Sequence, residues 1–202
     1  MIKPAWSRIL FFFFLFAGCS SYHPSSFEID ENILQEGDLV FRKGTSAASR
    51  VVLAADRSSG YSHIGIVVKD SHQWKVVHTV PGETDQECPE EVIKKELLSQ
   101  FFASKKAVSG AIFRLDTIES VSRKAAEKAL TLFERKLLFD HKYDLEDSTK
   151  MYCTELVFFV YNYAGVDLSE GRRRTYPAIQ GEFILPGDIL AYPKLIKIWG
   201  TQ

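Results

Sequence analysis

Residues 62–80 read SHIGIVVKDSHQWKVVHTV. Two runs rich in β-branched residues, 64–68 and 74–80, flank a polar connection at 69–73, a pattern typical of an antiparallel β-hairpin. With the turn centred between Asp70 and Ser71, His63 lies directly opposite His78. Directly opposed residues point to the same face of a sheet, with Cβ atoms about 5 Å apart. The sequence therefore predicts two imidazoles side by side on one face.

The segments on either side of this hairpin indicate a mixed α+β fold, with an antiparallel sheet packed against helices. The period of the apolar residues predicts a long helix at 118–139 and a second apolar helix at 151–164, which Gly165 ends. The other expected elements are a strand at 37–42, helices at 47–55 and 90–102, a strand at 111–115, and a closing strand at 189–192 after Pro186.

Composition excludes several classes of function. The chain has 202 residues and a formal net charge of −1, so it lacks the basic footprint of a nucleic-acid-binding protein. The basic triplet at 172–174 is expected to be a solvated loop. We find no glycine-rich phosphate loop and no cysteine–histidine spacing suited to tetrahedral zinc, so neither a metal nor another cofactor is expected.

The N-terminal segment predicts export and lipid anchoring. Lys3 and Arg8 precede an apolar run at 9–16, which is too short for a permanent membrane span but suits a signal peptide over residues 1–18. The small residues before Cys19 resemble the bacterial lipobox, although Phe16 stands where Leu is usual. The resemblance implies lipidation of Cys19, a tether over 19–35, and, by the sorting rule for Ser20, the periplasmic face of the outer membrane. A plain secretory signal or an uncleaved anchor are the alternatives.

Two further cysteines offer a choice between a disulfide and a working thiol. Cys88 lies in a polar, acidic stretch expected to be a loop, whereas Cys153 lies at the start of the apolar helix. Main-chain N–H groups at a helix N-terminus stabilise a thiolate, which predicts a lowered pKa for Cys153. His63 could take the thiol proton while His78 orients its ring. A Cys88–Cys153 disulfide would leave no such chemistry.

Three segments support the hypothesis that Cys153 is a working thiol. The runs GDLVF at 37–41, SHIGIV at 62–67 and YCTELV at 152–157 resemble, in this order, the permuted papain-like cysteine hydrolases of the YaeF/YiiX type, which are circularly permuted relatives of the NlpC cell-wall peptidases. The resemblance implies a permuted papain-like domain over 36–202, with Cys153 as nucleophile and His63 as general base. The third position, often Glu in that family, corresponds here to His78. Tyr61, Tyr143 and Tyr152 are candidates to line the pocket or assist an oxyanion hole.

The expected function is that of a lipid-anchored periplasmic thiol hydrolase. It would cleave an amide bond, with a peptide of the peptidoglycan type as the first choice of substrate. An acyl-lipid hydrolase or acyltransferase on the same fold is the nearest alternative. A non-catalytic lipoprotein that binds a peptide or lipid is the third. The other expected partner is the membrane, through the Cys19 lipid, and we expect a monomer.

Overall fold

The computed structural model describes residues 27–83, 90–177 and 179–201. The signal peptide predicted at 1–18, the part of the predicted tether at 19–26 with Cys19, and Cys88 therefore lie outside the described residues. Within the described ranges, no helix has both the length and the apolar character needed to cross a bilayer.

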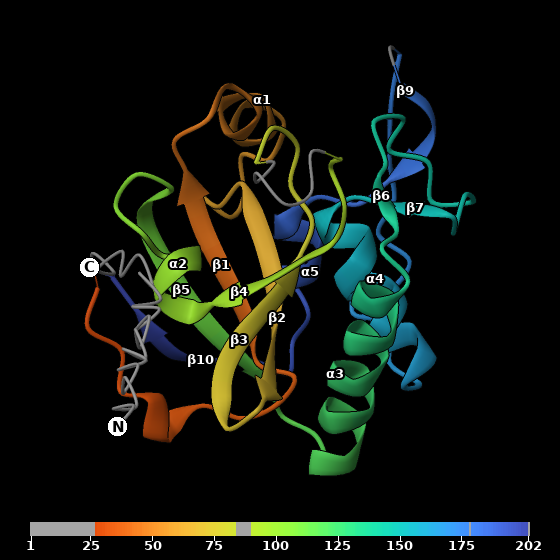
Figure 1. The fold of residues 1–202 in the computed structure, drawn as a ribbon. Helices are drawn as coiled ribbons and strands as arrows, with labels where there is room; N and C mark the ends of the chain where they lie inside the picture. The colour runs from red at the N-terminus through yellow and green to blue at the C-terminus, as the bar shows by residue number, and fades with distance from the viewer. Residues whose placement is uncertain (1–26, 84–89, 178, 202) are drawn as a thin grey trace, which may run out of the picture.

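A six-stranded antiparallel sheet forms the centre of the fold, with strand order β10-β5-β1-β2-β3-β4 (Figure 1). The predicted hairpin occupies the middle of this sheet as β2 and β3. The bounds of the strands are β1 Leu39–Gly44, β2 His63–Asp70, β3 Gln73–His78, β4 Lys94–Leu97, β5 Ala107–Leu115 and β10 Leu195–Gly200. The β6–β7 and β8–β9 pairs lie outside it, with bounds β6 Leu138–Phe139, β7 Lys150–Met151, β8 Arg174–Tyr176 and β9 Ile179–Phe183.

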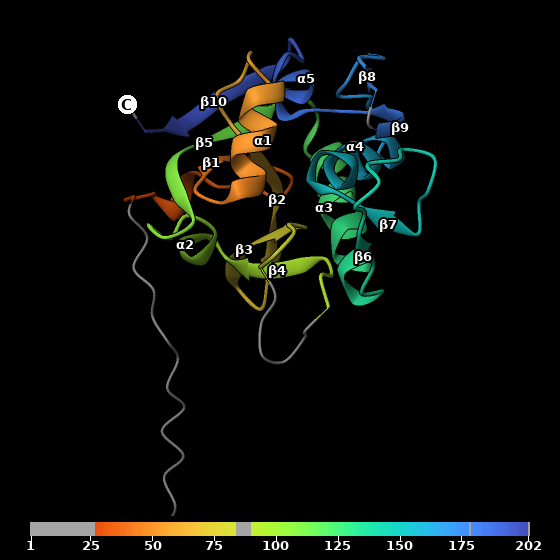
Figure 2. The ribbon, with the colours of Figure 1, turned by 90° about the horizontal axis from the view of Figure 1, so that it is seen from above.

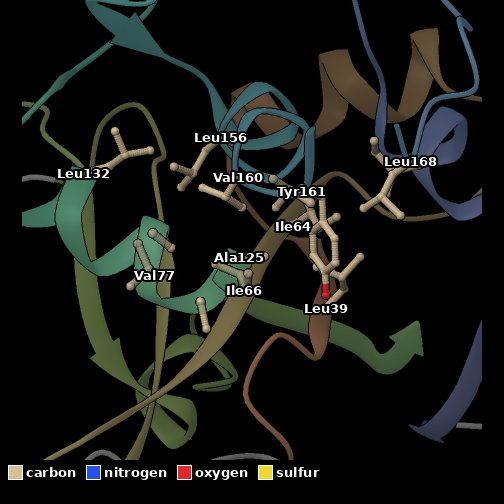
Figure 3. Packing of buried hydrophobic residues seen from close by; sticks show 14 of the residues in the cluster. Leu39, Ile64, Ile66, Val77, Ala125, Leu132, Leu156, Val160, Tyr161 and Leu168 are labelled. Atoms are coloured by element: carbon tan, nitrogen blue, oxygen red, sulfur yellow. The ribbon is translucent and has the colours of Figure 1, made fainter. Parts of the chain in front are cut away.

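Helices α3 (Glu119–Glu134) and α4 (Cys153–Tyr163) cover one face of the sheet (Figure 1). The main core lies between this pair and the strands, where Ile64 and Ile66 of β2 meet Leu156 and Val160 of α4 (Figure 3). Burial of each such side chain stabilises the fold by about 1.5–3 kcal/mol. Gly165, with a φ of +95°, ends α4 at the predicted position.

The second face of the sheet packs against α2 (Leu98–Phe101) and the start of the described chain. Val67 and Val76 meet Phe101 there, and Phe27 packs on Trp199. Part of the segment predicted as a tether therefore packs against the domain, including the 3-10 helix η1 (Glu31–Ile33). Since successive strand residues alternate between faces, Ile64 points toward α4 and Val67 toward α2.

Two short helices lie near the end of the sheet where β1 ends and β2 begins. Seen from above, α1 (Ala47–Ala55) covers this end and α5 (Pro186–Leu190) lies beside it (Figure 2). Asp56 at the C-terminus of α1 is buried and accepts a hydrogen bond of 2.6 Å from the Gly187 N–H of α5. This contact fixes the two helices against each other.

The register of the central hairpin differs from the prediction by one residue at the turn. Asp70 pairs with Gln73, so the turn consists of Ser71 and His72. Both have positive φ values, +50° and +66°, as in the tight two-residue turns that match the twist of antiparallel strands. Continuing this register sets His78 opposite Gly65, so the prediction that it directly opposes His63 is wrong. The two histidines are instead diagonal neighbours on one face.

The remaining predictions of secondary structure are confirmed in part. The α+β class with an antiparallel sheet is confirmed, and the helix at 47–55 has the predicted bounds. The helix predicted at 90–102 is wrong over 94–97, which form β4 because they complete the edge of the sheet beside β3. The long helix stops at Glu134 and not at 139. The strand predicted at 189–192 is wrong: Pro186 occupies the first turn of α5, where its fixed φ suits a helix, and the last strand is β10.

Candidate active site

Cys153 is the first residue of α4, and its neighbours fix the first turn of that helix. The Tyr152 N–H donates to Oε2 of Glu155 at 3.2 Å, which closes the turn. The Thr154 hydroxyl donates to the Ile184 carbonyl at 2.6 Å, and the Ile184 N–H donates to the Tyr152 hydroxyl at 2.9 Å. Cys153 itself is a half-buried free thiol at the mouth of this rigid turn.

The sulfur of Cys153 lies against main-chain N–H groups at the end of the sheet. Burial raises the pKa of the thiol to about 11, while hydrogen bonds from the N–H groups of Ile64, Thr154 and Cys153 itself oppose the shift. The lowered pKa expected from the helix N-terminus is therefore not found, because burial outweighs the N–H groups. The contact with Ile64 brings the sulfur to the peptide that follows His63.

His63 begins β2, and its ring packs on the α2 side of the sheet. The ring stacks on Phe101 with centroids 5.5 Å apart, and its Nε2 lies 2.9 Å from Nδ1 of His78. Burial lowers the pKa of His63 well below its ordinary value, and the positive charges of Arg42 and Lys106 lower it further. Nδ1 is the ring nitrogen of His63 that the bond to His78 leaves available.

His78 ends β3 and is completely buried. Its Nε2 lies 3.1 Å from Oε1 of Glu96 on β4. Burial lowers the pKa of His78, although Glu96 opposes this shift through its hydrogen bond and its charge. The sequence placed the two histidines together, and the structure brings them into hydrogen-bonding contact.

Glu96 is a site residue that the sequence analysis missed. It is partly buried, and His78 and Lys106 hold its pKa below the ordinary value despite the opposing effect of burial. The signal was hidden because Glu96 falls in a segment assigned to a helix, where its side chain would not face the hairpin. Assigning 94–97 to an edge strand beside β3 would have placed Glu96 opposite Val76, on the histidine face.

The histidine rings and the packing face of α4 lie on opposite sides of the sheet, and the thiol meets the histidine strand only at its end. Ile64 points to α4, whereas His63 stacks on Phe101 on the other side. Among the described residues, the hydrogen bonds of the His63 ring are to His78 and not to the sulfur. His63 is the buried first residue of β2, and the peptide N–H that follows it, that of Ile64, contacts the sulfur.

The three candidate tyrosines have different surroundings. The pKa of Tyr143 is raised by burial and then by the charge of a Cys153 thiolate, so its phenol is within electrostatic reach of the sulfur. Tyr152 is buried, and its hydroxyl is bound to the Ile184 N–H. Tyr61 packs on Phe41 at a centroid distance of 5.6 Å. Tyr143 thus remains a candidate to contact a substrate carbonyl, whereas the Tyr152 hydroxyl already binds the main chain.

A metal site does not emerge from the part of the chain that the structure describes. No group of three or more His, Cys, Asp or Glu side chains there is placed to hold an ion. His63 and His78 face each other through a hydrogen bond, which occupies one nitrogen of each ring.

Comparisons with known proteins identify the family and agree with the fold. The family described as "Permuted papain-like amidase enzyme, YaeF/YiiX, C92 family" matches residues 33–178. A crystal structure described as metalloprotein yiiX from Escherichia coli O157:H7 is similar with a TM-score of 0.64 and 19% identity, covering 89% of this chain and 99% of that one. A search of the curated proteins finds no match. The match spans well over half of the chain and confirms the resemblance of the three motifs, so this chain belongs to the permuted papain-like amidases of the YaeF/YiiX type.

Proposed function

We propose that this amidase-like enzyme hydrolyses an amide bond through Cys153 as nucleophile, His63 as general base and His78 as the residue that orients His63. The observation that carries the proposal is the 2.9 Å hydrogen bond between His63 and His78. It lies at the start of β2, where the N–H of the next residue, Ile64, contacts the sulfur of Cys153. A nucleophile, a base and an orienting group in sequence are the arrangement that thiol hydrolysis requires.

The resting state in this proposal is a neutral pair. Burial keeps the thiol protonated and the imidazoles uncharged at neutral pH, since it raises the pKa of Cys153 and lowers those of His63 and His78. Nδ1 of His63 takes the thiol proton as the sulfur attacks the substrate carbonyl carbon. The new C–S bond and the broken C=O π bond give a tetrahedral oxyanion. The Cys153 N–H and the Tyr143 hydroxyl are the proposed donors to that oxygen.

Collapse of the oxyanion breaks the C–N bond, and the imidazolium of His63 gives its proton to the leaving amine. The product is a thioester on Cys153. A water molecule then loses a proton to His63 and attacks the thioester, and the same imidazolium returns the proton to the departing sulfur. The substrate leaves as a carboxylic acid and an amine, and the enzyme regains its starting protonation state.

The proposed location is the periplasmic face of the outer membrane, with a lipid on Cys19. The signal-like segment and its lipobox-like ending support this proposal. A wild-type chain should gain the mass of a diacylglyceryl modification in an export-competent bacterium, and Cys19→Ala should not. A wild-type chain without lipid would overturn the anchoring proposal and leave the catalytic one standing.

The proposed substrate is a peptide of the peptidoglycan type, which an enzyme at this location would meet. The full chain, purified in detergent, would be incubated separately with muropeptides and with phospholipid vesicles, and the products identified by mass spectrometry. We expect cleavage of an amide bond in the muropeptides and a trapped thioester on Cys153. Cleavage of an ester bond in the phospholipids alone would replace the substrate proposal with the acyl-lipid alternative.

Variants of the site test the chemistry. Cys153→Ala should abolish hydrolysis, and His63→Ala should reduce it by about 10²–10⁴-fold. His72→Asn is the matched control, because His72 lies exposed in the hairpin turn with a φ of +66°, a conformation that Asn tolerates. Undiminished turnover by Cys153→Ala would refute the proposed nucleophile.

A further inference from the structure

A charged network extends the histidine pair across the edge of the sheet. Nε2 of His78 lies 3.1 Å from Oε1 of Glu96, and Oε2 of Glu96 lies 2.6 Å from Nζ of Lys106. NH1 of Arg42 lies 3.9 Å from the same Oε1. Glu96 is therefore bound on one side by an imidazole and on the other by cations, in a partly buried setting where charge-assisted hydrogen bonds are strong.

The charges that face the histidines come from four directions. Arg42 belongs to β1, Glu96 to β4, and Lys106 to the chain that enters β5. Glu83, after β3, accepts from Arg42 at 2.5 Å and pairs with Lys106 at 3.0 Å. Lys94 of β4 is the register partner of His78. Arg42 and Lys106 hold the pKa of Glu83 below its ordinary value, and His78 and Lys106 do the same for Glu96, so both carboxylates are ionised at neutral pH.

An ionised Glu96 determines which nitrogen of each imidazole carries the proton. A carboxylate only accepts hydrogen bonds, so His78 must present an Nε2–H to it. In a neutral ring the other nitrogen is then an acceptor, so Nδ1 of His78 accepts from Nε2–H of His63. The same rule leaves Nδ1 of His63 with a free lone pair. The chain of hydrogen bonds that begins at Glu96 thus ends on the nitrogen that must act as the base.

We propose that Glu96, held by Lys106 and Arg42, is a positioning residue that sets the tautomers of His78 and His63 and so makes Nδ1 of His63 the basic nitrogen. This role rests on the proposed function for its catalytic consequence, but the tautomers themselves are a property of the resting protein. It gives the site four members, Cys153, His63, His78 and Glu96, where the motif comparison gives three.

The first test reads the tautomers directly. In the full chain labelled with ¹⁵N-histidine, long-range ¹H–¹⁵N spectra at pH 7.5 should show both His63 and His78 as neutral Nε2–H forms. Assignment would use His63→Gln and His78→Gln. Glu96→Gln should abolish the single fixed tautomer of His78, because an amide side chain can donate as well as accept. An Nδ1–H tautomer of either histidine in the wild type would overturn the proposal, whatever the enzyme turns over.

The second test measures the pH dependence of turnover. Glu96→Gln should lower the plateau rate by about 10–100-fold and move the acidic limb down by about one pH unit, because the imidazolium loses its anionic partner. Lys106→Met should move the same limb in the opposite direction, since Lys106 lowers the pKa of His63. Two opposite shifts from neighbouring substitutions are not expected of a merely structural role.

Glu134→Gln is the matched control. Glu134 is exposed and lines the same groove of about 1030 Å³ as Glu96, but it has no hydrogen bond to His78. We expect its profile to follow the wild type. A Glu96→Gln profile that coincides with the wild type, while Cys153→Ala is inactive, would refute the role of Glu96 alone. Full activity of Cys153→Ala would instead refute the proposed function, and the role of Glu96 would then be decided by the tautomers of His63 and His78.

Discussion

Gly65 occupies the position on the histidine face between His63 and Val67, opposite His78 in the continued register of the hairpin. A Cβ atom at this position would lie 2.5 Å from Cγ1 of Val76, 3.1 Å from Cβ of His78 and 3.2 Å from the Val77 carbonyl oxygen. The first of these distances is too short for any real contact, and Val76 is a stiff, completely buried side chain that cannot rotate away. The missing side chain thus leaves the space across which His78 reaches His63.

Gly65→Ala is therefore expected to lower the free energy of unfolding by about 1–3 kcal/mol, the usual cost of overpacking a buried site. It should also reduce turnover by about 10–100-fold, because a displacement of the histidine pair on the order of 1 Å weakens proton transfer. Urea unfolding of the full chain followed by tryptophan fluorescence gives the first quantity, and the hydrolysis assay gives the second.

A double-mutant cycle with Val76→Ala separates the clash from other causes. Val76→Ala alone should cost about 2 kcal/mol through loss of buried apolar groups. In the double variant, the shortest contact is removed, so the total loss should be smaller than the sum of the two single losses by about 1–2 kcal/mol. Activity should recover less than stability, since the close approach to His78 remains. A Gly65→Ala protein as stable and active as the wild type, or strictly additive losses, would refute this reasoning.

Three further predictions follow from other parts of the site. Burial raises the pKa of Glu155 to about 9, so folding favours its neutral form, and stability is lost as the pH rises from the ordinary carboxyl value toward 9. At pH 8 the free energy of unfolding, measured with urea, should be higher for Glu155→Gln than for the wild type, by about 4–5 kcal/mol at most. Near pH 4 the two proteins should be equally stable. The raised pKa of Cys153 predicts that iodoacetamide labels this residue more slowly at pH 7 than it labels a free cysteine, and that the labelling rate rises above pH 9. Labelling would be measured by peptide mass spectrometry in the Cys88→Ser variant. Fast labelling below pH 7 would indicate a thiolate–imidazolium pair instead. Asp188 is buried and accepts bidentate hydrogen bonds of 2.8–3.1 Å from Arg174. Asp188→Asn should therefore lower the free energy of unfolding by about 2–4 kcal/mol in thermal or urea unfolding, and a loss below about 0.5 kcal/mol would contradict a stabilising role of this ion pair.

Local patterns in the sequence were sufficient to predict the elements that carry the candidate site residues. The hairpin at 62–80 and the helix that begins near Cys153 follow from β-branched runs, apolar periods and a terminal glycine, which act within a few residues of chain. These patterns also placed His63 and His78 on one face. The detail they missed was the turn, where two consecutive positive φ values at Ser71 and His72 shifted the register by one residue.

Longer-range pairing explains the remaining errors. Residues 94–97, read KKEL, have good helix formers and no alternation that favours a strand. They form β4 because the edge of β3 offers unpaired main-chain groups, a circumstance that no local pattern contains. The predicted closing strand is wrong for a different reason: Pro186 followed by Asp188 is a helix start signal and not a turn before a strand.

The error at β4 had a functional consequence, because Glu96 could be recognised as part of the site only after the strand was in place. A carboxylate on an edge strand beside two buried imidazoles is costly unless it is paired, and here His78 and Lys106 both pair with it. The neutral state of the histidines and the ionised state of Glu96 then depend on each other: the carboxylate fixes the proton on Nε2 of His78, and that proton stabilises the carboxylate. In the proposed mechanism, a site assembled in this way keeps Nδ1 of His63 unprotonated without a charged histidine, so that proton transfer from Cys153 occurs only when the substrate is bound.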